Sequence, residues 1–172
     1  MLSIEIFNAK QNLLNDQEIL KIVEIECHPE VEKWLYEHKK QDYQEEFKDY
    51  RDFFYDLTRN DKVEGIIAKH DGNIIGFLCL WRQEAYMEHV ASIGISIHPN
   101  YWGKGVATQL IEFGIKLSKI KGLKRLEIET LSNNVGMIRV AEKLGFKLEG
   151  IREKRVYKKG SYFDEVLYSM LL

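Results

Sequence analysis

The sequence HPNYWGKGVAT, residues 98–108, is the stretch from which the fold can be worked out. An alternating apolar run, IGISI at residues 93–97, comes directly before it, and apolar residues at helical spacing follow it from Val106 to Leu117. This order predicts a strand, a tight glycine-containing turn and the N-terminus of a helix in immediate succession. Unpaired backbone N–H groups and the positive end of the helix dipole together favour an anion at such a junction. We therefore expect a phosphate-bearing ligand at this turn.

The composition narrows the class of protein. The chain has 172 residues, enough for a full hydrophobic core, and we expect residues 1–172 to form a single domain. Its formal net charge of −2 argues against general nucleic-acid binding, which usually needs a basic excess. The two cysteines, Cys27 and Cys79, form neither a disulfide framework nor a paired metal motif, so we expect no metal and a reduced, cytoplasmic environment. No signal pattern opens the chain and no apolar run reaches membrane-spanning length, so we expect no membrane partner.

Periodicity along the rest of the chain predicts the remaining elements. In the first helix, Glu26 continues the helical spacing set by Ile19 and Ile22, after a capping-box start at Asn15. Hairpin connections early in the chain and a strand–helix–strand crossover later predict an α/β fold. We expect a mixed, mostly antiparallel central sheet of about seven strands with helices on both faces. The strands are expected over residues 3–9, 65–70, 74–81, 89–98, 124–131, 147–157 and 162–172, the helices over residues 15–27, 41–57, 105–121 and 134–144, and a short helix or turn over residues 31–38.

The glycine pair Gly103 and Gly105 is a weak signal on its own. Glycine lets the backbone approach a ligand without obstruction by a Cβ, but a tight turn can also need glycine for its dihedral angles alone. The run is not a nucleoside-triphosphate loop, because no Gly-Lys-Ser/Thr closes it at the required spacing. Nor is it the usual dinucleotide fingerprint, whose third glycine would fall at Thr108.

Two linked motifs indicate a family. Residues 97–107, I-x-P-x-x-W-G-x-G-V-A, resemble the acetyl-CoA-binding signature of the GNAT superfamily of N-acetyltransferases. Residues 134–146, N-x-x-M-I-R-x-x-E-K-x-G-F, resemble the second signature of the same superfamily. Glu149-Gly150 and the run G-x-Y-x-D-E at residues 160–165 resemble the branch that contains small-molecule and ribosomal-protein acetyltransferases. The resemblance covers residues 4–172 by element order and is specific from about residue 93 onward.

The resemblance implies a fold and a cosubstrate. In this superfamily the fourth and fifth strands splay apart, and the pantetheine arm of acetyl-CoA lies in the wedge between them. Backbone groups of Ile95 and Ile97 would pair with that arm like an added strand, and the Ile97 N–H would polarise the thioester carbonyl. Asn134 would contact the pantetheine side. The pyrophosphate would be held by the backbone of Trp102, Gly103, Lys104, Gly105, Val106 and Ala107, together with Thr108.

The signature usually has Gln or Arg where this chain has Trp102, but a backbone cradle does not need that side chain.

Two catalytic roles stay open. The tyrosine with which family members often protonate the leaving thiolate is replaced by Ala141. Glu129 on the predicted fifth strand is the first candidate for general base, because its strand borders the expected splay. The alternative candidates are Glu88, His89 and Glu127.

Residues 41–57 combine an aromatic stripe with an acidic face. The stripe is interpreted as core, or alternatively as part of the wall of an acceptor pocket. The acidic face is interpreted as solvated, or alternatively as a weak attractor of a cationic substrate. The stripe consists of Tyr43, Phe47, Tyr50 and Phe54, and the acidic face of Asp42, Glu45, Glu46, Asp49, Asp52 and Asp56.

The resulting hypothesis is an acetyl-CoA-dependent N-acetyltransferase that acts on a primary amine by direct attack in a ternary complex. We favour a small-molecule amine, such as an amino acid, an amino sugar or a polyamine. N-terminal acetylation of a protein is an alternative within the class. A non-catalytic acyl-CoA-binding module, favoured by Ala141, and a different phosphate-ligand binder such as a nucleotide protein are alternatives outside it. The resemblance also implies a homodimer.

Overall fold

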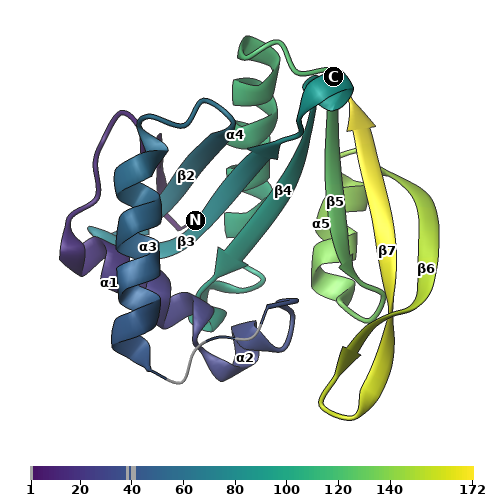
Figure 1. Cartoon of the computed structure of the whole chain (residues 1–172), viewed down its shortest axis with the longest axis horizontal. Helices are drawn as coiled ribbons and strands as arrows, with labels where there is room; N and C mark the ends of the chain where they lie inside the picture. The colour runs from purple at the N-terminus through teal and green to yellow at the C-terminus, as the bar shows by residue number, and fades with distance from the viewer. Residues whose placement is uncertain (1, 38, 40–41) are drawn as a thin grey trace.

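A seven-stranded sheet runs through the structure (Figure 1). The structure is a computed structural model that describes residues 2–37, 39 and 42–172. The strand order is β1-β2-β3-β4-β5-β7-β6, and neighbouring strands are antiparallel except β4 and β5, which run parallel. The mixed, mostly antiparallel sheet predicted from the sequence is therefore confirmed. The strands are β1 Glu5–Asn8, β2 Val63–His70, β3 Asn73–Arg82, β4 Val90–Ile97, β5 Arg125–Leu131, β6 Lys147–Lys158 and β7 Ser161–Leu171.

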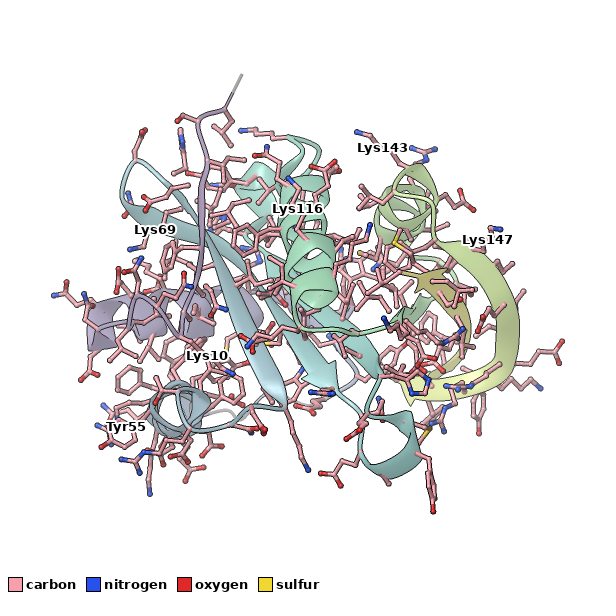
Figure 2. The ribbon with its side chains drawn as sticks, turned by 90° about the horizontal axis from the view of Figure 1, so that it is seen from above. Lys10, Tyr55, Lys69, Lys116, Lys143 and Lys147 are labelled. Carbon is pink, nitrogen blue, oxygen red and sulfur yellow. The ribbon has the colours of Figure 1, made fainter. Side chains whose placement is uncertain are left out.

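Helices cover both faces of the sheet, as predicted. One buried cluster joins Ile22 of α1 and Phe54 of α3, and the other joins Leu110 of α4 and Ala141 of α5. Seen from above, α3 with Tyr55 lies on one side of the sheet and α4 with Lys116 on the other (Figure 2). No helix in the described part of the chain is long and apolar enough to cross a membrane. The helices are α1 Asp16–Glu26, α2 Pro29–Glu32, α3 Tyr43–Leu57, α4 Val106–Ile120 and α5 Val135–Lys143, with 3₁₀ turns η1 Ala85–Met87 and η2 Pro99–Tyr101.

The segment after α1 departs from the prediction. A short helix or turn was expected over residues 31–38, after a break at Pro29, whereas α2 begins at Pro29 and ends at Glu32. Pro29 occupies the first helical position, where its missing N–H costs no hydrogen bond. His28 caps the helix, because its Nδ1 accepts a hydrogen bond of 3.1 Å from the Glu30 N–H. The proline therefore starts α2, while α1 ends before it at Glu26, as predicted.

The connection from α2 to α3 lies beside a large cavity. Trp34 and Leu35, which the sequence predicted to face inward, are half-buried and line this cavity. The next helix begins at Tyr43. His38 and Gln41, at the ends of the two predicted ranges, lie outside the described residues.

β4 and β5 separate along their length. Their pairing runs from Val90 and Arg125 to Ser92 and Glu127 and then stops. Beyond that point the two strands diverge, and the N-termini of α4 and α5 lie at the open end (Figure 1). This is the splay that the sequence predicted between the fourth and fifth strands. It opens at the carboxyl ends of the parallel pair, where ligands usually bind in α/β sheets.

Candidate active site

The free edge of β4 turns backbone groups toward the splay. His98 donates its N–H to the carbonyl oxygen of Ile75 at 2.9 Å. Backbone groups along an antiparallel ladder alternate in direction, so those of Ile97 and Ile95 point away from β3 and toward β5. Pairing with β5 has already ended at Ser92, so these groups border the cavity. They lie where the sequence predicted a backbone edge that pairs with an extended ligand.

Trp102 closes the end of β4. Its indole Nε1 donates a hydrogen bond of 2.8 Å to the carbonyl oxygen of Ile97. Trp102 also ends the η2 turn, whose start is capped by His98 through a 3.2 Å hydrogen bond from the Asn100 N–H to Nδ1. The indole engages the Ile97 carbonyl, while the Ile97 N–H still faces the cavity. The Trp102 side chain therefore supports the turn, beyond the backbone role that the sequence predicted for this residue.

The turn leaves the N-terminus of α4 open. Gly103 and Gly105 have φ values of +71° and +83°, a left-handed conformation that residues with a Cβ rarely adopt. A Cβ on either glycine would meet no atom within 4 Å, so the space beside this backbone is open. Gly105 is the N-cap of α4 and offers no side chain to cap the helix. The first N–H groups of α4, from Val106 to Thr108, are therefore available to an anion.

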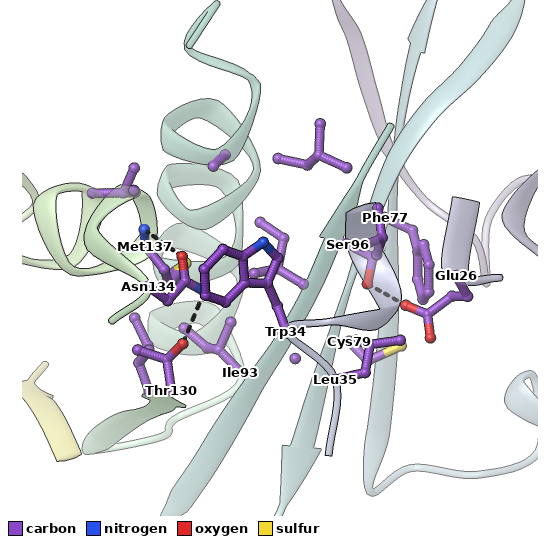
Figure 3. A pocket seen from close by; sticks show the side chains of 18 of the residues that line it. Glu26, Trp34, Leu35, Phe77, Cys79, Ile93, Ser96, Thr130, Asn134 and Met137 are labelled. Carbon is purple, nitrogen blue, oxygen red and sulfur yellow. Dashed lines mark hydrogen bonds between the residues drawn. The ribbon is translucent and has the colours of Figure 1, made fainter. Parts of the chain in front are cut away.

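Asn134 lies on the other wall of the splay (Figure 3). Its Oδ1 accepts a hydrogen bond of 3.3 Å from the Met137 N–H, which makes it the N-cap of α5. Its Nδ2 donates to Thr130 Oγ1 at 3.0 Å. This structural role is the ordinary one for an asparagine at a helix start. Asn134 also lines the cavity, and its contact with a pantetheine arm stays a prediction.

These elements enclose a continuous cavity of about 1230 Å³. It extends from the turn before α4, along the splay, to the C-terminus of α1 and the middle of α3. Pockets for single drug-sized ligands measure about 300–1,000 Å³, so this cavity is larger than a pocket for one such ligand. In Figure 3, Trp34 lies between Asn134 on one side of the cavity and Ser96 on the other.

The two halves of the cavity carry opposite charges. Arg139 and Lys143 of α5, one helical turn apart, line the half beside the open α4 N-terminus. This half, here called the donor half, suits a ligand with phosphates. The other half, here called the acidic half, suits a cation, and Lys39 is its one cationic lining residue among those that the structure describes. Its carboxylates belong to Glu26, Glu37, Glu46 and Asp49.

Glu26 is the centre of the acidic half. It is the last residue of α1 and only 7% exposed. Its Oε1 accepts a hydrogen bond from Ser96 Oγ of β4, and its Oε2 accepts one of 2.9 Å from the Tyr50 hydroxyl. The Lys39 ammonium lies 2.9 Å from the same Oε2 and 2.8 Å from the Tyr50 oxygen. Burial, and then the charge of Glu26, raise the pKa of Tyr50 above its ordinary range, so this hydroxyl keeps its proton and continues to donate.

Glu129 lines the cavity from β5, next to the predicted splay. One of its carboxylate oxygens lies 3.3 Å from Nη1 of Arg152, and the same nitrogen lies 2.8 Å from the buried Glu165. Arg152 therefore contacts the Glu129 carboxylate, whose role as general base stays a prediction. The alternative candidates Glu88, His89 and Glu127 do not line the cavity.

Ala141 faces the core. It has no exposed surface and belongs to the buried cluster between the sheet and α5. The position from which family members often supply a tyrosine therefore lies outside the cavity wall here, and the structure provides no acid from it.

Sequence reasoning missed the acidic half as a unit. The signal for it was Glu26, which continues the spacing of Ile19 and Ile22 and so places a carboxylate on the apolar face of α1. The members of the aromatic stripe differ in their surroundings, and a role in an acceptor pocket stays a prediction. Phe54 is core at 5% exposure, whereas Tyr50 lines the cavity and bonds to Glu26.

Comparison with known proteins identifies the family. Residues 26–146, more than half of the chain, match the acetyltransferase (GNAT) family. The chain therefore belongs to the GNAT acetyltransferase family, which confirms the family predicted from the two motifs. L-amino acid N-acetyltransferase AaaT of Escherichia coli is 29% identical, over 59% of this chain and 64% of its own length. The uncharacterized N-acetyltransferase YnaD of Bacillus subtilis is 27% identical, over 69% of this chain and 70% of its own length.

Solved structures share the fold. The acetyltransferase yncA of Salmonella typhimurium, solved with its cofactor acetyl-CoA, has a TM-score of 0.79 at 16% identity and covers 98% of this chain and 93% of its own. Ribosomal-protein-S5-alanine acetyltransferase of Vibrio fischeri has a TM-score of 0.80 at 19% identity and covers 98% of this chain and 92% of its own. The relatives named here are N-acetyltransferases, the enzyme class predicted from the sequence.

Proposed function

We propose that the chain transfers an acetyl group from acetyl-CoA to a primary amine of a small molecule, by direct attack in a ternary complex. The observation that carries this proposal is the cavity of about 1230 Å³, which joins an open helix N-terminus to an acidic half. Two substrates held side by side can react directly, without a covalent acyl-enzyme. The name of the Escherichia coli relative and the acetyl-CoA in the yncA structure support the proposal.

The donor half fits acetyl-CoA. The backbone N–H groups of residues 102–108 would hold the pyrophosphate, and Arg139 and Lys143 add positive charge to that half. The backbone groups of Ile95 would pair with the pantetheine arm. Acetyl-CoA, when bound, supplies the acetyl thioester. The Ile97 N–H would donate to the thioester carbonyl oxygen and stabilise the negative charge that develops there during attack.

Glu129 acts as the general base in this proposal. An amine attacks only in its neutral form, so the acceptor ammonium must first lose a proton. Glu129 accepts that proton, directly or through one water molecule, and Arg152 holds its carboxylate in place. The leaving thiolate is a weak base and departs without an acid from this chain.

The wall formed by the segment after α2 favours a small-molecule acceptor over a protein terminus. Trp34 and Leu35 line this cavity, so the segment after α2 forms part of its wall. Lys158 of β6 donates hydrogen bonds of 2.5 and 2.6 Å to the carbonyl oxygens of Glu32 and Leu35. These bonds tie that segment to the β6–β7 hairpin, which holds this wall of the cavity in place. The homodimer and the cytoplasmic location play no part in this proposal and stay predictions.

Thiol release from acetyl-CoA tests the proposal. The assay compares a panel of small amines with a panel of peptides, and mass spectrometry identifies the products. We expect an acetylated small amine. Acetylation of peptides alone would replace this proposal with protein N-terminal acetylation. Tight binding of CoA without turnover on either panel would indicate a non-catalytic acyl-CoA-binding module.

A thermal-shift comparison tests the donor separately. We expect acetyl-CoA to raise the melting temperature, because it would fill the splay and satisfy the open N–H groups. Stabilisation by ATP or NAD and not by acetyl-CoA would contradict the assignment of the donor half.

A further inference from the structure

The acidic half already holds an ammonium group. Lys39 Nζ lies 2.9 Å from Glu26 Oε2 and 5.1 Å from the centre of the Tyr50 ring. A carboxylate beside an aromatic face provides both charge attraction and a cation–π contact for an alkylammonium ion. The side chain of Glu26 is 9% exposed and that of Lys39 is 10% exposed, so this pair is shielded from water. The geometry defines a binding place for one ammonium ion.

The surroundings of this place favour positive charge. Burial lowers the pKa of Lys39, but the charge and hydrogen bond of Glu26 outweigh burial, and the pKa is raised overall. Lys39 reaches the place from the connection between α2 and α3, outside any helix or strand. Glu26 also accepts hydrogen bonds from Ser96 and Tyr50, so it keeps two donors when a different ammonium replaces Lys39.

Ser96 links this place to the proposed donor. It lies on β4 between Ile95 and Ile97, whose backbone groups face the splay. Its hydroxyl donates to Glu26. A group bound to Glu26 therefore lies beside the part of β4 that would hold the thioester.

We propose that Glu26 binds the ammonium of the acceptor in the place that the Lys39 ammonium occupies, and that the preferred acceptors are alkyl diamines and other cationic amines without a neighbouring carboxylate. This inference rests on the proposed function and names its substrate class. Glu37 lines the same half as Glu26. A second positive charge on the acceptor is attracted there, whereas a carboxylate is repelled.

A matched pair of amines tests the substrate class. L-lysine differs from 1,5-diaminopentane only by one carboxylate, so the comparison isolates the effect of that charge. We expect kcat/KM for 1,5-diaminopentane to exceed that for L-lysine by about tenfold or more. Equal rates, or a preference for L-lysine, would overturn the inference.

Two substitutions with opposite expected effects test the residues. Glu26→Gln keeps the shape of the side chain and removes its charge, and it should raise the KM for 1,5-diaminopentane about tenfold or more. Lys39→Met removes the internal competitor and should lower that KM severalfold. Asp52→Asn is the control, because Asp52 is an exposed carboxylate on α3 outside the cavity, and it should change neither value. The KM for acetyl-CoA should stay constant in all three variants.

The outcomes separate this inference from the proposed function. Turnover of amino acids or peptides, but not of diamines, would sustain acetyl transfer and overturn the diamine assignment. Absence of turnover on every panel would overturn the proposed function without deciding the binding site. Calorimetric titration of the CoA-bound protein with 1,5-diaminopentane would then measure binding to the site directly. Binding to the wild type that is lost in Glu26→Gln would support the site, and absence of binding to the wild type would overturn it. If Glu26→Gln fails to fold, the Lys39→Met variant and the matched pair of amines decide.

Discussion

The indole Nε1 of Trp102 donates a hydrogen bond of 2.8 Å to the carbonyl oxygen of Ile97, so one side chain sets the position of the glycine turn relative to the edge of β4. Trp102→Phe keeps an aromatic ring and removes this donor. We expect the substitution to lower the free energy of unfolding by about 1 kcal/mol, the usual net value of a hydrogen bond. The KM for acetyl-CoA should also rise severalfold, because the turn and the strand edge would lose their common support. Denaturant titration and steady-state kinetics measure the two effects, and an unchanged KM would show that the turn holds its shape without the indole.

Gly105 and Gly72 allow a matched test of the pyrophosphate turn. Both have a positive φ, +83° and +77°, and a Cβ on either would meet no atom within 4 Å. Alanine should therefore cost both positions a similar amount of stability, about 1–2 kcal/mol, from left-handed backbone strain. Only Gly105→Ala should raise the KM for acetyl-CoA, because Gly72 lies in the β2–β3 hairpin turn, away from the cavity. Equal KM values in the two variants would remove Gly105 from the donor site.

The catalytic role of Glu129 can be tested against Glu127 on the same strand. Loss of a general base commonly slows a reaction about 10²–10⁴-fold, so we expect Glu129→Gln to reduce kcat on this scale with little change in the KM for acetyl-CoA. Glu127→Gln is the control, because Glu127 lies outside the cavity and pairs with Arg125 at 2.7 Å. Steady-state kinetics of the two variants would show this loss of kcat in Glu129→Gln only. Full activity of that variant would assign proton removal elsewhere.

The lowered pKa of Glu149 predicts part of the acid sensitivity of the fold. Hydrogen bonds from Arg125, and then from Ser169, lower the pKa of Glu149 from 4.5 to about 2. The unfolded carboxyl therefore takes up its proton at a higher pH than the folded one, and stability falls as pH drops from about 4.5 toward 2. The contribution is fully present above the unfolded pKa.

Denaturant unfolding at about pH 6 and about pH 3 measures this dependence. Glu149→Gln should show a smaller loss of unfolding free energy between the two conditions than the wild type. Glu153→Gln, which changes an exposed carboxylate of the same strand, should behave as the wild type does. A wild-type slope in the Glu149 variant would count against the bridge that joins β6 to β5 and β7.

Local patterns predicted the elements, while long-range packing decided the site. The alternation in residues 93–97 and the two glycines after it were enough to place β4, the turn and α4, because these structures depend on neighbouring residues. The capping box at Asn15 was equally local and is present, with Glu18 accepting from the Asn15 N–H at 2.9 Å. By contrast, the helix after α1 was expected from residue 31 although it begins at Pro29, because proline can both end a helix and occupy its first position.

The contacts within the acidic half could not be predicted from sequence patterns. Glu26, Lys39 and Tyr50 meet Ser96 only after α1 and α3 have packed on the sheet. Ser96 is 70 residues from Glu26 along the chain, so no spacing rule connects them. The splay and the backbone assignments at Ile95 and Ile97 were within reach because the family resemblance supplied the three-dimensional relation between the two motifs.

The early end of β4–β5 pairing also bears on aggregation. A strand edge with free N–H and C=O groups is a template on which another chain can add a strand. Most sheets carry such edges on the rim, as β1 and β6 do here. The splay creates two more, and it creates them in the interior of the sheet, where the walls of the cavity surround them. The protein can therefore offer a free backbone edge to a small extended ligand inside the cavity, without adding an edge to the rim of the sheet.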